Sequence, residues 1–244
     1  FDRNRGVMKG SGRDRYGLGF TLQYRIKDKI IIRNYASYSN THAYDSPYGS
    51  FSTYAAANPY ERPWFDNGEL RPTLLNGSAN PLYDASLPNR SLNDNEAFSD
   101  NLNIDWIAGN GWRLIGSLRI EKGNIQGETY RSPLSSDFLV EKRPENEYVD
   151  EVTYEQVPLE QRGELSLSSG KYLNYTGKLT VNYNKQFGEK HLLFFGAGAE
   201  INQNRTSTYS FTATGFADDR YSDPAFAIQF MEDSRPGSSA STTR

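Results

Sequence analysis

The sequence predicts an all-β protein: an antiparallel meander of about six long strands that forms an incomplete segment of a large transmembrane β-barrel. Six stretches alternate apolar and polar side chains with the period of two that is typical of strands. No stretch approaches the roughly 18 apolar residues that a membrane-spanning helix needs. The connections between the stretches are alternately very short and very long, as in outer-membrane barrels.

The first predicted strand runs from about Asp14 to Arg25, and a tight polar turn at 27–29 leads into a second strand from about Ile30 to Ser39. Apolar residues in the first strand alternate with small or polar ones, so one face is expected to meet lipid and the other the barrel interior. The residues of this strand predicted to face lipid are Tyr16, Leu18, Phe20 and Leu22. Three consecutive isoleucines leave the orientation of the second strand open.

The third and fourth predicted strands form a hairpin around the sequence Gly-Asn-Gly at 109–111, whose residues accept positive φ. In the third strand, Leu102, Ile104 and Trp106 share one face and are predicted to contact lipid. The fourth strand follows at once from Trp112 and shows the same alternation. Its charged residues fall on the opposite face, toward water.

The fifth strand has the cleanest alternation, and a short turn at 187–190 joins it to a sixth strand from about His191 to Asn202. Asn, Thr and Lys alternate with the apolar residues of the fifth strand, so one face is expected to meet lipid. The residues of this strand predicted to face lipid are Leu173, Tyr175, Leu179, Val181 and Tyr183.

The long connections, at about 40–99, 122–171 and 203–244, all fall on one side of the meander, and the short turns fall on the other. This asymmetry is typical of barrels with short periplasmic turns and long extracellular loops. Six strands are fewer than the 8 or so of the smallest such barrels, so the sheet would expose two unpaired edges. The sequence therefore predicts part of a larger wall.

Composition excludes several functions. The chain has 244 residues, no Cys and a formal net charge of −3, so neither a thiolate metal site nor a basic nucleic-acid surface is expected. The two His residues, His42 and His191, have no recognisable nucleophile and orienting group, and no enzyme is predicted. Acidic residues at 141–155 and 94–100 match no calcium loop in spacing. No metal or cofactor is predicted.

Four segments resemble SusC-like TonB-dependent outer-membrane transporters of Bacteroidetes, and the likeness covers nearly the whole chain. They correspond in order to the middle portion of the family's barrel. The segments are SPYGSFSTYAAANPYERP at 46–63, NPLYDASL at 80–87, YNKQFGEKHLLFFGAGAE at 183–200 and GFADDRYSDPAFAI at 215–228.

The resemblance implies a barrel that is 22-stranded in this superfamily, located in the bacterial outer membrane and plugged by an N-terminal domain. It also implies a SusD-like lipoprotein partner, energy from the TonB complex, and a glycan, oligosaccharide or peptide cargo. Residues 1–244 are then one partial barrel domain, and the plug and the TonB-contacting segment are expected to be absent from this chain. The start of the sequence also lacks the pattern of a secretion signal.

The first long loop is rich in aromatic residues, which supply large contact areas at a low cost in conformational entropy. They are candidates for contact with cargo or partner. Packing within the loop or membership of an interfacial aromatic girdle are the alternatives. The candidate residues are Tyr48, Phe51, Tyr60, Trp64, Phe65 and Tyr83.

Two other classes of protein remain as alternatives. A surface adhesin or soluble carbohydrate-binding protein would use the same alternation in a sandwich, with the apolar face covered by a second sheet. A barrel enzyme would depend on His42. The first alternative predicts that the apolar face of the fifth strand is enclosed, whereas the barrel predicts that it is not.

Overall fold

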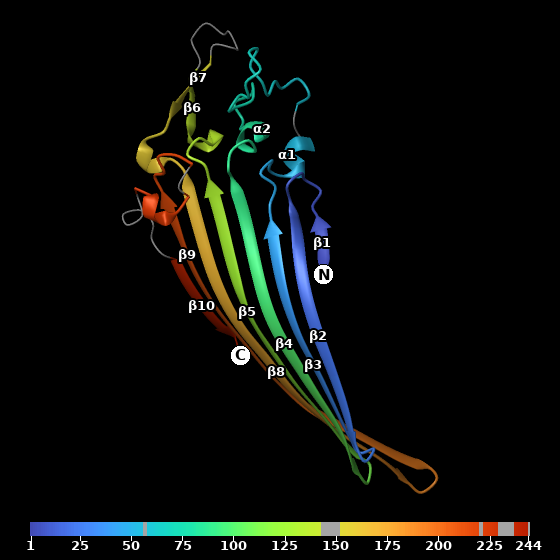
Figure 1. Ribbon diagram of the computed structural model, residues 1–244. Coiled ribbons are helices and arrows are strands. Elements are labelled where there is room, and N and C mark those ends of the chain that lie inside the picture. The colour runs from blue at the N-terminus through green and yellow to red at the C-terminus, as the bar shows by residue number, and fades with distance from the viewer. Residues whose placement is uncertain (56–57, 143–151, 220–221, 229–236, 244) are drawn as a thin grey trace.

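The strands form one long curved antiparallel sheet, with most of the loop structure gathered at one end (Figure 1). The computed structural model describes residues 1–55, 58–142, 152–219, 222–228 and 237–243. The sheet has eight strands in the order β1-β2-β3-β4-β5-β8-β9-β10, and each strand pairs with its neighbours in antiparallel register. In the described part of the chain β1 and β10 are the two edges, so the sheet is not closed.

Six strands are long, and two short strands lie at the edges of the sheet. The long strands are β2 (Gly12–Ile26), β3 (Ile30–Tyr44), β4 (Arg90–Gly109), β5 (Trp112–Arg131), β8 (Glu164–Phe187) and β9 (His191–Thr214). The edge strands are β1 (Asp2–Arg5) and β10 (Gly237–Thr243). The predicted fold class, an open antiparallel segment of a barrel with six long strands, is therefore confirmed.

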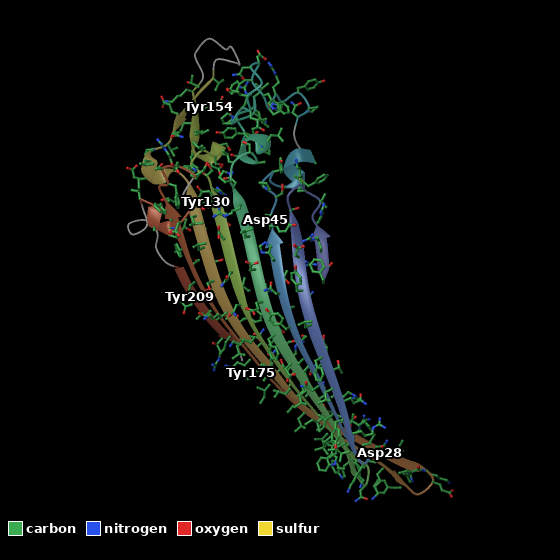
Figure 2. All side chains as sticks on the ribbon, in the orientation of Figure 1. Asp28, Asp45, Tyr130, Tyr154, Tyr175 and Tyr209 are labelled. Atoms are coloured by element: carbon green, nitrogen blue, oxygen red, sulfur yellow. The ribbon has the colours of Figure 1, made fainter. Side chains whose placement is uncertain are left out.

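Three short turns lie together at one end of the sheet, the turn end (Figure 1). Residues in these turns adopt the positive φ that tight hairpins require: 44° at Lys27, 50° at Asp28, 54° at Asn110, 88° at Gly111 and 62° at Gly188. The predicted hairpins are thus present. Figure 2 shows Asp28 at the turn end and Tyr154 at the opposite end of the molecule.

The opposite end, the loop end, carries the long connections and the short elements within them (Figure 1). The chain therefore passes repeatedly between the turn end, with its short turns, and the loop end, with its long connections. The short elements are α1 (Phe51–Ala55), α2 (Pro81–Asp84), β6 (Leu139–Lys142), β7 (Thr153–Gln156) and 3₁₀ turns at Ser136–Phe138, Leu159–Gln161 and Pro224–Phe226. None of the helices among the described residues is long and apolar enough to cross a membrane.

The strands extend further toward the loop end than the alternation predicted. The first long connection spans 45–89 rather than 40–99, and the second spans 132–163 rather than 122–171. Within the third predicted loop, β9 continues to Thr214 and β10 pairs back onto residues 204–210. The hydrogen-bonded pairing of the strands continues into segments whose side chains are polar on both faces. Such segments show no alternation of apolar and polar residues in the sequence.

A small buried core lies at the loop end, where the connection after β9 folds back onto the sheet. Tyr130, Leu165 and Ala213 occupy one row across β5, β8 and β9, and Phe216 covers them. The Tyr130 and Phe216 rings meet edge to face with 5.9 Å between centroids. The rest of the sheet has no comparable core among the described residues, because it is a single layer.

Candidate membrane-facing surface and loop cap

All of the residues predicted to face lipid lie on one face of the sheet. Directly paired residues in an antiparallel ladder share a face. The register aligns Leu22, Asn34, Leu102, Leu118 and Gly177 in one row, and the other predicted residues follow at steps of two. We call this surface the apolar face; it includes Tyr16, Leu18, Phe20, Leu22, Leu102, Ile104, Trp106, Leu173, Tyr175, Leu179, Val181 and Tyr183.

No second sheet covers the apolar face in the part of the chain that the structure describes. Leu18 and Phe20 keep 76% and 63% of their surface exposed. Tyr175, Val181 and Tyr183 are half-buried, because neighbouring side chains on the same face partly cover them. A contiguous apolar surface of this kind is unfavourable in water and marks an interface with protein or lipid. The enclosed sandwich expected for an adhesin is not what the structure shows.

The apolar face also contains residues that were not among those predicted to face lipid, although their strands were predicted to have two distinct faces. On β9, Phe195, Ala197, Ala199 and Ile201 pair directly with apolar-face residues of β8. Their alternation was visible in the sequence, but many small residues weakened the contrast between the two faces. On β5, Trp112 joins the same face, and its ring lies 4.6 Å from that of Tyr183.

The opposite surface, the polar face, carries paired charges. Arg113 donates from Nε and Nη2 to the two carboxylate oxygens of Asp105, at 2.9 and 2.6 Å. Lys178 Nζ lies 3.1 Å from Glu200 Oε2 across β8 and β9. Such exposed ion pairs contribute little to stability, but they show that this face suits water rather than hydrocarbon.

The long connections at the loop end are joined into an ordered unit, which we call the loop cap (residues 45–89 and 132–163, as far as described). The buried side chain of Asn80, 1% exposed, donates from Nδ2 to the main-chain oxygens of Pro63 (2.9 Å) and Arg71 (2.7 Å). Its Oδ1 accepts from the Leu82 amide at 3.1 Å and so caps α2. One side chain therefore fixes three parts of the first connection.

Hydrogen bonds join the two long connections to each other. The Asp84 carboxylate accepts from Ser135 Oγ (2.8 Å) and from the amide and Oγ of Ser136 (2.9 and 2.5 Å). Thr73 Oγ1 donates to Glu141 Oε2 at 2.5 Å and lies 2.9 Å from the Tyr154 hydroxyl. The first connection is thereby attached both to the 3₁₀ turn after β5 and to the β6–β7 hairpin.

Three of the aromatic contact candidates are engaged within the structure. Lys9 Nζ lies 5.3 Å from the Tyr48 ring centroid, and the guanidinium of buried Arg71 lies 4.8 Å from that of Phe65. The Tyr83 hydroxyl donates to the main-chain oxygen of Leu134 at 3.0 Å. Burial raises the pKa of Tyr83, and the nearby carboxylates of Asp84 and Asp219 raise it further.

The other three candidates, Phe51, Tyr60 and Trp64, are exposed, and Tyr60 keeps 85% of its surface accessible. Sequence reasoning identified the aromatic content of this connection but not the buried polar residues that organise it. Arg71 and Asn80 have no sequence signal that distinguishes them from ordinary loop residues.

The two His residues occupy positions of different character. His42 Nδ1 lies 2.5 Å from Asp94 Oδ1 in a directly paired position on β3 and β4, and both side chains are about half exposed. His191 begins β9 and is exposed. Among the described residues, no cluster of three or more His, Asp or Glu side chains could hold a metal ion. Residues 143–151, which include part of the acidic run, lie outside the described residues.

An open antiparallel sheet with short turns at one end, long loops at the other, and one apolar and one polar face is the architecture of a segment of a β-barrel wall. No protein-family model matches this sequence, and a comparison with curated proteins found no match.

Solved structures match this chain, and each match covers 95% of its length. The RagAB peptide importer in its "closed-closed" state gives a TM-score of 0.64 at 14% identity, and the "open-open" state gives 0.67 at 16%. A further structure of the RagAB peptide transporter gives 0.66 at 16% identity. The matched region covers 24–25% of those chains, so this chain spans about a quarter of their length. The similarity establishes the fold, and the solved proteins that share it are transporters.

Proposed function

We propose that this chain is part of the barrel wall and loop region of a SusC-like, TonB-dependent transporter in the bacterial outer membrane. The main support is the apolar face, which continues across six strands with no covering layer among the described residues. On β2 this face runs from Tyr16 to Ile26, and 11 residues of strand span about 36 Å. Tilted by about 45°, they would cover the roughly 25 Å of a membrane's apolar band.

The transported cargo is proposed to be a peptide or an oligosaccharide. The solved structures with the same fold are named as peptide importers, whereas the family resemblance admits both cargo classes. The polar face, with its paired charges, would line the interior, and the loop cap would lie on the extracellular side.

Deleting the gene of the full-length transporter tests this function. Labelled mixtures of peptides and of oligosaccharides are supplied to wild-type, deleted and complemented cells, and depletion of each component from the medium is measured. We expect the deletion to abolish depletion of one class, complementation to restore it, and a protonophore to block it in wild-type cells. Unchanged depletion of both classes in the deleted strain would refute the proposal.

We further propose that Phe51, Tyr60 and Trp64 contact a SusD-like lipoprotein that covers the extracellular mouth. These aromatic side chains are exposed, whereas Tyr48, Phe65 and Tyr83 are occupied within the structure. Changing Tyr60 and Trp64 together to Ala should reduce copurification of the lipoprotein severalfold, because exposed aromatics commonly anchor protein interfaces. Leu134→Ala, which removes another exposed apolar side chain of the loop cap, is the matched control and should have little effect.

A further inference from the structure

Three cations stand where the apolar face ends on neighbouring strands. Toward the loop end, the apolar run of β5 ends at Ile120 and is followed on the same face by Lys122. On β8, Leu173 is followed by Lys171 in the same way. On β9, Arg205 pairs directly with Leu173. Lys122, Lys171 and Arg205, which we call the basic triad, therefore surround one leucine at the margin of the apolar face.

The basic triad differs from three polar-face cations of β5 and β8 in its lack of carboxylate partners. Arg113, Arg119 and Lys178 on the polar face each form an ion pair. Within the described ranges, none of the triad residues has a carboxylate within 4.0 Å, and all three side chains are exposed.

The carboxylates of the same face nearest to the triad belong to β4, and each already has a hydrogen-bond partner there. Asp94 pairs with His42, Glu96 accepts from the Tyr38 hydroxyl at 2.8 Å, and Asp100 accepts from Asn34 at 2.8 Å. These hydrogen bonds hold the carboxylates of β4 toward β3 and leave the triad without a carboxylate partner among the described residues.

A buried amide holds the guanidinium of Arg205. Gln203 is 7% exposed, and its amide satisfies both neighbours when its oxygen is oriented toward Arg205. In that orientation the oxygen accepts from Arg205 Nε (2.9 Å) and Nη2 (3.1 Å), and the nitrogen donates to the Tyr175 hydroxyl. The contact uses only one edge of the guanidinium. The other edge, formed by the two terminal nitrogens, has the geometry that binds a phosphate in a bidentate manner.

An apolar groove lies on the same face and the same strands, closer to the turn end. It has a volume of about 460 Å³ and exists because Gly116 and Gly177 leave space in the side-chain layer. A Cβ added at either glycine would meet no atom within 4 Å. The apolar residues that line the groove are Leu102, Ile104, Leu118, Leu179, Ala199 and Ile201.

We propose that the basic triad and the apolar groove together bind one phosphorylated, acylated glycolipid of the outer leaflet, of the lipid A class. The phosphate would contact the triad and an acyl chain would lie in the groove. Lys122 and Leu118 are four residues apart along β5, about 13 Å, which a single lipid spans easily. The inference rests on the proposed membrane location, in which the loop end, and with it the triad, faces the outer leaflet.

Native mass spectrometry of the detergent-purified full-length transporter tests the inference. The probes are diphosphoryl lipid A, the same lipid with its phosphates removed, phosphatidylglycerol and inorganic phosphate. We expect wild-type protein to retain diphosphoryl lipid A at least about tenfold better than the dephosphorylated lipid, since each basic residue near an anionic headgroup adds measurable affinity. The triple variant Lys122→Gln, Lys171→Gln, Arg205→Gln should lose this preference.

Two further variants separate the parts of the site. Arg119→Gln removes a positive charge from the polar face of β5, the strand that carries Lys122, and it should bind as wild type does. Gly177→Leu places a side chain in the groove from a position where an added Cβ meets no atom within 4 Å, and it should lower retention of lipid A severalfold while the basic triad remains. Equal retention by the wild type and the triple variant, or a preference for phosphatidylglycerol or free phosphate, would overturn the inference.

Fractionation of the same cells shows whether a negative result refutes only the lipid site or the proposed function as well. Wild-type protein found in the outer membrane that imports its cargo but shows no preference for phosphorylated lipid A would refute the lipid site alone. Absence of the protein from the outer membrane would refute the proposed function as well. Each variant is included only if it shows the folded, heat-modifiable electrophoretic band of the wild type.

Discussion

Asp84 and Ser136 form two hydrogen bonds to each other, although 52 residues of sequence separate them. The Asp84 carboxylate accepts from the Ser136 amide at 2.9 Å and from its hydroxyl at 2.5 Å. Asp84 ends α2 in the first long connection, and Ser136 begins the 3₁₀ turn after β5. Together with the contacts of Thr73 and Tyr83, this contact joins the two long connections to each other.

Replacing Asp84 by Ala should therefore loosen the loop cap without disturbing the sheet. The change leaves the buried amide and hydroxyl of Ser136 without their acceptor, and hydrogen bonds to a charged group are each worth about 1.5–3 kcal/mol. We expect amide hydrogen exchange to accelerate at residues 132–138 and to stay unchanged within β8. Asp28→Ala, which removes a carboxylate at the turn end, is the control. Unchanged exchange at 132–138 would show that the loop cap does not depend on this contact.

The hairpin between β4 and β5 offers a test of turn geometry. Gly111 has φ of 88°, and a Cβ placed there would lie 2.1 Å from the main-chain oxygen of Asn184. Gly111→Ala should therefore destabilise the protein by about 1–3 kcal/mol, through both the unfavourable φ and the contact with β8. The measurement is the urea midpoint of the full-length protein, followed by the loss of heat-modifiable mobility.

Gly188→Ala is the matched control for this change. Gly188 also sits in a turn with positive φ, 62°, but nothing lies within 4 Å of its added Cβ. The penalty there should be limited to the backbone conformation, about 1 kcal/mol. If both variants lose the same stability, the contact between the β4–β5 turn and Asn184 is not a source of strain.

The faces of the strands could be predicted from the sequence, because side chains in a strand alternate with a period of two and lipid favours a uniform apolar face. Leu22 and Leu102 belong to strands separated by a long connection, yet their shared face followed from local pattern alone. The strand ends toward the loops could not be predicted in this way. Around Asn40 and Glu96 both faces are polar, so the ladder continues without an alternating signal.

The interior of the loop cap could not be predicted either, because it depends on contacts between residues far apart in the sequence. The Tyr83 hydroxyl reaches the main-chain oxygen of Leu134, and Thr73 reaches Glu141. The composition of each connection gives no indication of its partner in the other. The short edge strands were missed because their polar residues are defined by pairing with β2 and β9, not by periodicity.

Tyr83 should ionise at a higher pH than an ordinary tyrosine. Its partial burial raises the pKa, and the carboxylates of Asp84 and Asp219 add to the effect. Because the pKa is higher in the folded state than in the unfolded chain, the stability contributed by the neutral phenol is complete below about pH 10. It is lost as pH rises from there toward the raised pKa of the folded state.

The difference in absorbance at 295 nm between wild type and Tyr83→Phe, followed against pH, isolates this phenol. We expect its midpoint in the folded protein to lie above the midpoint of the same difference in urea-unfolded protein, because partial burial and nearby carboxylates raise the pKa of Tyr83. A midpoint for Tyr83 in the folded protein at or below that in the unfolded protein would contradict the partly buried position of its ring in the loop cap.

The membrane assignment predicts opposite outcomes for neighbouring residues of β8. Leu179 lies on the apolar face near the middle of its strand's apolar run, and Thr180 lies on the polar face. An arginine at the lipid-facing midplane of a barrel costs about 2–4 kcal/mol, whereas interior positions tolerate charge. Leu179→Arg should therefore lower the yield of folded barrel in the outer membrane and its urea midpoint, and Thr180→Arg should change neither by much. If the effects are equal or reversed, the apolar face does not contact lipid, and the proposed transport function loses its main support.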